Sequence, residues 1–150
     1  AMTMISNFAT DVFSLSTQRV LIGATGKLHA SNLVIEANTL ETEDGAVIDM
    51  DGQGYTASGP GYGPDMAGAS HGGYGGHPSG TEQTGSCYDD FHHPTLPGSG
   101  GKNSQGGGAL QLHASSVIHD GVIMARGSSG TSGSGGGAGG SVWIRADTLQ

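Results

Sequence analysis

The sequence predicts an all-β protein, a parallel right-handed β-helix or solenoid of about four short coils that carries a long glycine- and histidine-rich insertion. First, short runs of Val, Ile, Leu and Ala alternate with polar residues, which is the period of a half-buried strand. Second, these runs recur at intervals of about 20 residues. Third, Gly or Ser interrupts nearly every window, so no long helix is expected.

The repeat consists of a longer strand followed by a shorter one. The longer strands are expected at 13–20, 33–40, 110–117 and 142–149, and the shorter ones at 26–30, 46–50 and 121–125. Alternation alone would also suit an antiparallel sandwich, but a sandwich has no reason to repeat one spacing between its strands.

The predicted core consists of side chains that stack at equivalent positions of successive coils. The proposed inward ladders are Leu15/Ile35/Leu112/Ile144, Thr17/Ala37/Ala114/Ala146, Val20/Leu40/Val117/Leu149 and Leu28/Ile48/Ile123. Polar residues such as Glu36, Gln111 and His113 then face outward. A slip of one residue would invert this separation, so it supports the register.

One domain is expected over residues 13–150, with residues 1–12 as a lead-in. Its long insertion is placed at 53–108, and a Gly/Ser loop is placed at 128–141. Ala1-Met2 is typical of a cloning remnant, and no secretory leader follows it, so we expect an excised fragment.

Charge and hydropathy exclude two classes of partner. The net charge is −8 with 5 Lys and Arg in total, and these are scattered, which argues against nucleic-acid binding. No apolar run approaches the roughly 20 residues of a transmembrane helix, so no membrane span is expected in this fragment.

The insertion gathers side chains that commonly bind divalent metals such as zinc. The candidate ligands are His71, His77, Cys87, Asp89, His92 and His93. Their spacing matches no known metal motif, so the alternative is that they hydrogen-bond the glycine-rich backbone. A calcium site near the second coil is a further option, with Glu41, Glu43, Asp44, Asp49 and Asp51 as oxygen ligands, although solvated loop charge is favoured there.

Cys87 is the single cysteine, so the chain has no internal disulfide. Burial is expected for this residue type, and pairing with another chain is the alternative. The insertion also holds most of the aromatic residues, namely Tyr55, Tyr62, Tyr74, Tyr88 and Phe91. They are expected to pack the insertion onto the solenoid, and stacking on sugar rings is the alternative.

Several strings from residue 68 onward carry a resemblance to a known group of proteins. The strings are Gly68-Ala69-Ser70-His71-Gly72-Gly73-Tyr74-Gly75-Gly76, Pro97-Gly98-Ser99-Gly100-Gly101, Gly106-Gly107-Gly108-Ala109-Leu110 and Gly136-Gly137-Ala138-Gly139-Gly140-Ser141-Val142-Trp143-Ile144. Over about residues 26–150 the chain resembles large glycine-rich surface and secreted proteins of eukaryotes with GGxGGS[IV]WI-type repeats. The resemblance implies a parallel β-helix, an extracellular or cell-surface location and a structural or adhesive role, and it transfers no catalytic residue.

Two functions follow as expectations. The first is a non-catalytic extracellular module of a surface or matrix protein, which contacts other modules of the same protein and a protein or glycan ligand. The second is a polysaccharide lyase or glycosidase, suggested by fold analogy alone. Its candidate acid and base are Asp89 and Asp90, assisted by His92 or His93. Neighbouring carboxylates usually diverge, so the sequence favours the module over the enzyme.

Overall fold

The computed structural model describes residues 11–57, 59–77 and 84–150, which form seven strands and no helix. The four long strands are β1 (Val12–Ile22), β3 (Asn32–Thr42), β5 (Ala109–His119) and β7 (Ser141–Leu149). The three short strands are β2 (Lys27–His29), β4 (Val47–Asp49) and β6 (Val122–Met124).

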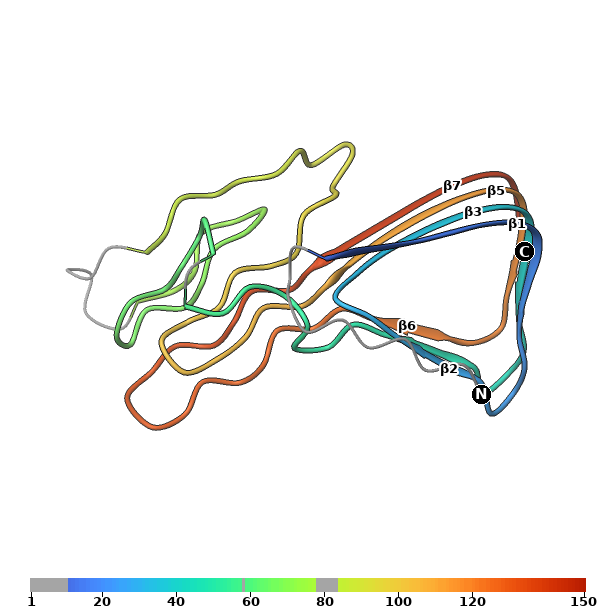
Figure 1. Cartoon of the computed structure of the whole chain (residues 1–150). Helices are drawn as coiled ribbons and strands as arrows, with labels where there is room; N and C mark the ends of the chain where they lie inside the picture. Colours follow the sequence, from blue (N-terminus) through green and yellow to red (C-terminus); the bar gives the residue numbers. More distant parts are fainter. Residues whose placement is uncertain (1–10, 58, 78–83) are drawn as a thin grey trace.

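All strand pairs are parallel, and they form two separate sheets. The long strands form a sheet in the order β1-β3-β5-β7, and the short strands form a sheet in the order β2-β4-β6. Figure 1 shows the two sheets on opposite sides of a shared interior. The predicted β-helix is therefore wrong: the described strands form two open parallel sheets of four and three strands, with no closed solenoid.

The difference has a physical reason in the glycine-rich segments. After β4 and after β6 the chain leaves the sheets and runs far beyond them before it returns as β5 and β7 (Figure 1). No short strand follows β7 in the described residues, so the smaller sheet has one strand fewer than the larger one. The glycine-rich segments pair with one another rather than closing the two sheets into coils.

Strand register follows the predicted repeat. Leu15 pairs with Ile35, which in turn pairs with Leu112, and Leu112 pairs with Ile144. The second predicted row pairs Thr17, Ala37, Ala114 and Ala146 in that order, the third pairs Val20, Leu40, Val117 and Leu149, and the fourth pairs Leu28, Ile48 and Ile123. Equivalent side chains thus stack on neighbouring parallel strands about 4.8 Å apart.

Burial is deepest in the two central strands of the larger sheet. Ile35, Leu40 and Leu112 are 0% exposed, whereas Leu149 on the edge strand β7 is 63% exposed. The core also contains Leu33 and Leu110, which are fully buried and were not among the predicted ladders. The side chains of a ladder are therefore less buried on the edge strand than on the central strands.

A glycine-rich layer, formed by segments 52–57, 59–76, 97–108 and 127–140, extends from one end of the sheets (Figure 1). Backbone hydrogen bonds join segments of this layer that are distant in sequence. Examples are the bonds from Gly98 N–H to the Gly107 oxygen (2.8 Å) and from Gly107 N–H to the Ala138 oxygen (2.9 Å). A Cβ atom on Gly106 would overlap the carbonyl of Gly98. Side chains are thus excluded at this close approach of two backbones.

Candidate functional site

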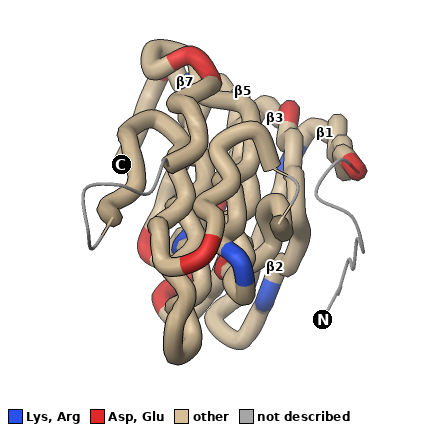
Figure 2. Tube along the Cα trace, turned by 90° about the vertical axis from the view of Figure 1, so that its left-hand side faces the viewer, with Lys and Arg blue, Asp and Glu red and all other residues tan. Residues whose placement is uncertain are grey.

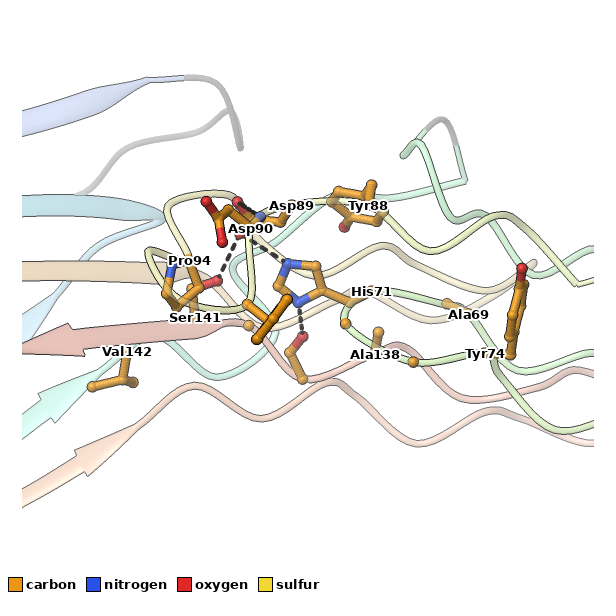
Figure 3. A pocket seen from close by; sticks show the side chains of 15 residues that line it. Ala69, His71, Tyr74, Tyr88, Asp89, Asp90, Pro94, Ala138, Ser141 and Val142 are labelled. Carbon is orange, nitrogen blue, oxygen red and sulfur yellow. Dashed lines mark hydrogen bonds and ion pairs between the residues drawn. The ribbon is translucent and has the colours of Figure 1, made fainter.

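A cleft of about 490 Å³ lies where the glycine-rich layer meets the start of β7. Its lining comes from three stretches of chain that are distant in sequence, within 69–74, 88–94 and 138–142. A volume of this size falls in the range of small-ligand sites in proteins. Figure 3 shows the labelled side chains of this cleft and the interactions that join them.

Asp89 is the centre of the hydrogen-bond network beside the cleft. Its Oδ1 accepts the N–H of Asp90 (2.9 Å), and its Oδ2 accepts those of Thr95 (2.9 Å) and Leu96 (2.8 Å). The Ser141 hydroxyl lies 3.2 Å from Oδ2 and 2.8 Å from the Leu96 oxygen, and its single proton serves one of them at a time. One carboxylate therefore ties the turn that follows it to the first residue of β7.

The backbone and charge of Asp89 are both unusual. Its φ is 71°, a left-handed conformation that Asp and Asn tolerate better than other side-chain-bearing residues. Burial favours the neutral acid, but the N–H donors of Leu96, Asp90 and Thr95, together with His71, outweigh it and hold the pKa of Asp89 below its usual range. The carboxylate is thus kept ionised although its side chain is only 7% exposed.

His71 joins the carboxylate to the glycine-rich layer. Its Nε2 lies 3.3 Å from Asp89 Oδ2, and its Nδ1 lies 2.9 Å from the carbonyl oxygen of Gly139. Both contacts are hydrogen bonds at once only when both ring nitrogens carry a proton. The ring also stacks on Tyr88 with 4.7 Å between centroids, so its orientation is fixed from three directions.

Tyr88 packs against the His71 ring and anchors this wall of the cleft. Its hydroxyl donates to the carbonyl of Pro97 (2.6 Å) and accepts from the hydroxyl of Ser99 (2.9 Å), while its ring packs edge-on against Tyr55. Burial is the main cause that raises the pKa of Tyr88 to about 12. The phenol is therefore a neutral structural group at physiological pH.

The rim of the cleft differs from its centre because its side chains face water. Tyr74 is 78% exposed and Phe91 is 83% exposed. The Asp90 carboxylate is 59% exposed and accepts the N–H of His92 (2.8 Å), the main cause that holds the pKa of Asp90 below its usual range. The rim thus offers two aromatic rings and one ionised carboxylate.

The turn that carries the rim rests on the outer face of the larger sheet. The His93 ring contacts the Trp143 ring edge-on at 5.1 Å between centroids, and Trp143 also contacts His113 at 4.7 Å. Trp143 and His113 lie on neighbouring strands, β7 and β5. This stack attaches the insertion to the sheet on one face.

The structure separates most of the predicted zinc ligands. It brings together His71 and Asp89, but Asp89 is already bonded to backbone N–H groups. The rings of His92 and His93 instead lie near Asp90, at 3.7 and 3.9 Å. Within the described ranges, no group of three or more His, Cys, Asp or Glu side chains is placed to hold a metal ion. His77 and Cys87 are among the described residues and belong to no such group.

Four of the five carboxylates predicted as calcium ligands have other partners. Three of the five form ion pairs with basic side chains: Glu41 with Arg19 (2.6 Å), Asp49 with Lys27 (2.7 Å) and Asp51 with Arg126 (2.7 Å). Glu43 accepts the N–H of Ala24 (2.8 Å). The described residues, Asp44 included, contain no carboxylate cluster arranged for a metal.

Two kinds of catalysis meet obstacles at this site, namely acid–base catalysis by the predicted pair and attack by Ser141 as a nucleophile. A general acid needs a raised pKa, yet the pKa values of Asp89 and Asp90 are both lowered. Asp89 also lies between Ser141 and His71, whereas a nucleophilic triad requires the histidine between the serine and the carboxylate. The exposed His92 does not line the cleft, and its ring lies tilted against that of Phe91 at 3.9 Å between centroids.

Two further expectations have mixed outcomes. Burial of Cys87 is wrong, because the residue is exposed. The aromatic residues were expected to pack the insertion onto the solenoid; Tyr55 and Tyr88 instead pack against each other within the insertion, and the rings of Tyr74 and Phe91 are exposed. Sequence reasoning also missed the role of Ser141, because a serine at the start of a strand gives no signal of a carboxylate partner so distant in the sequence.

Comparisons with known proteins add no relative. No family model matches the chain, and neither the curated proteins nor the solved structures contain a significant match. The resemblance to glycine-rich surface proteins therefore stays a prediction from motifs. The part of the chain that the structure describes contains no helix able to cross a membrane.

Proposed function

We propose that the chain is a non-catalytic module of an extracellular surface or matrix protein, with a structural and adhesive role. This proposal rests on the role of Asp89. Its carboxylate is buried and accepts hydrogen bonds on both oxygens, so it fixes the wall of the cleft and is not available as an acid or base. The exposed rings on the rim are then left for contact with a ligand.

The wider surface is consistent with such a role. Acidic and basic segments are few and are scattered among uncharged ones (Figure 2). With 5 Lys and Arg in the chain and a net charge of −8, the electrostatic surface does not suit a nucleic acid. A protein or glycan ligand and neighbouring modules of the same protein remain the partners that we propose.

The test compares adhesion with turnover. Beads coated with the purified chain are applied to layers of extracellular matrix and to a panel of polysaccharides, and released reducing ends are measured in parallel. We expect retention of the beads without release of reducing ends. Turnover that disappears in Asp90→Ala would overturn the proposal in favour of an enzyme.

A further inference from the structure

We propose that the cleft beside Asp89 binds a non-acidic glycan, one whose sugar rings are neutral or carry an amine. This inference rests on the proposed adhesive function and names the ligand class of that function. It depends on four features of the cleft: the exposed aromatic rings, the spread of the lining side chains, the sign of the charge and the rigidity of the walls.

The aromatic rings supply the apolar contact. Phe91 and Tyr74 both line the cleft and are among the most exposed large apolar side chains of the described residues. A pyranose ring presents a face of C–H groups, and such a face removes apolar surface from water when it packs on an aromatic ring. Polar groups around the edges of the sugar then remain near the polar part of the lining.

The lining side chains are spread along the cleft rather than gathered around one point. In Figure 3, Tyr74 lies at one end, Pro94 and Val142 lie at the other, and the pair of His71 and Asp89 lies between them. A linear chain of sugars matches this spread better than a compact ligand does. The volume of about 490 Å³ also suits a ligand larger than a single small ring.

Charge selects against acidic sugars. The lining contains the carboxylates of Asp89 and Asp90 and no Lys or Arg. The exposed Asp90 carboxylate would repel a uronate or a sulfate, and it would attract an ammonium group beside the Phe91 ring. Neutral hydroxyl groups can donate hydrogen bonds to the same carboxylate.

The walls are arranged before a ligand arrives. The N–H donors on Asp89 and the bond from His92 N–H to Asp90 hold the turn that presents Phe91. Gly72 and Gly73, which also line the cleft, have no heavy atom within 4 Å on the side where a Cβ would lie, so a ligand can approach their backbone. Little ordering entropy is then lost on binding.

A glycan fits these features better than a folded protein partner does. The core of a protein–protein interface is a continuous apolar patch with few charges. Here the two aromatic rings belong to different stretches of chain, and the hydrogen-bonded polar pair of His71 and Asp89 lies within the same lining. Separated rings with polar groups between them match the alternation of C–H faces and hydroxyl groups along a sugar chain.

The test uses the whole chain on an array of immobilised glycans in three classes: neutral, amine-bearing, and acidic with uronate or sulfate groups. We expect binding to members of the first two classes and at least tenfold weaker binding to the acidic class. Phe91→Ala and Tyr74→Ala should each weaken binding about tenfold or more. Leu21→Ala, which truncates an exposed apolar side chain of β1 outside the cleft, should leave binding unchanged.

Other outcomes overturn the inference. These are binding to acidic glycans alone, binding to no glycan, or binding that survives both aromatic substitutions. Thermal unfolding followed by Trp143 fluorescence checks that each variant is folded. If coated beads adhere to matrix proteins while no glycan binds, this inference fails and the adhesive function stands; if the beads adhere to nothing, both fail.

Discussion

Replacing Asp89 with Asn tests whether this carboxylate holds the cleft together. Asn tolerates the φ of 71° and has the same shape, so the substitution changes charge and hydrogen bonding only. If its single oxygen faces the N–H of Leu96, its NH₂ group faces the N–H of Asp90, and one charge-assisted bond is lost. With the contact to His71 also weakened, we expect unfolding to become easier by about 2–4 kcal/mol.

Urea unfolding followed by Trp143 fluorescence measures this loss, because the indole contacts His93 in the same insertion. Amide hydrogen exchange at Thr95 and Leu96 should become faster at the same time, since their N–H groups lose a charged acceptor. The matched control is Asp90→Asn, whose side chain is 59% exposed and should cost less than about 1 kcal/mol. Equal stability of Asp89→Asn and the natural chain would refute the assigned role.

Three further predictions concern the core, the glycine-rich layer and pH. Leu112→Asp places an unpaired charge at a fully buried position and should prevent folding as judged by circular dichroism, whereas Leu21→Asp at a 51% exposed position should fold. Gly106→Ala should lower the free energy of unfolding by about 1–3 kcal/mol because its methyl group meets a backbone carbonyl, whereas Gly72→Ala, with open space, should cost less in a urea titration. Folding lowers the pKa of Asp89, so the ionised carboxylate contributes its full stabilisation of the fold above its ordinary pKa of 3.8, and this contribution is lost as the pH falls below 3.8. In an acid titration, the free energy of unfolding of Asp89→Asn should therefore fall less steeply than that of the natural chain.

The sheets were predictable at the level of residue pairs and not at the level of architecture. Alternating apolar residues at a fixed spacing identify partners such as Ile35 and Leu112, because parallel strands place equivalent side chains in one ladder. Closure into coils depends on the segments between the strands. Glycine has no side chain and so gives no periodic signal, and contacts such as Gly54 with Gly106 join distant positions.

The site was predictable in residue type and not in bonding. His71 and Asp89 were both candidates, and the structure does bring them together. Imidazole and carboxylate serve equally as metal ligands and as hydrogen-bond partners of backbone, so the sequence leaves both roles open. The turn after Asp89 gives this carboxylate the hydrogen-bonding role, because it presents the N–H groups of Thr95 and Leu96 to the carboxylate of Asp89.

The exposed rings require an explanation that stability does not supply. Within the described residues, the network around Asp89 and the backbone pairs of the glycine-rich layer fix the walls without Phe91 and Tyr74, whose rings lie largely in water. Large apolar surface in water does not stabilise the folded chain, because it is exposed in the unfolded chain as well. Such a surface contributes favourable free energy only when a ligand covers it. A rigid wall built from backbone and one buried carboxylate is what allows two such rings to be presented in fixed positions.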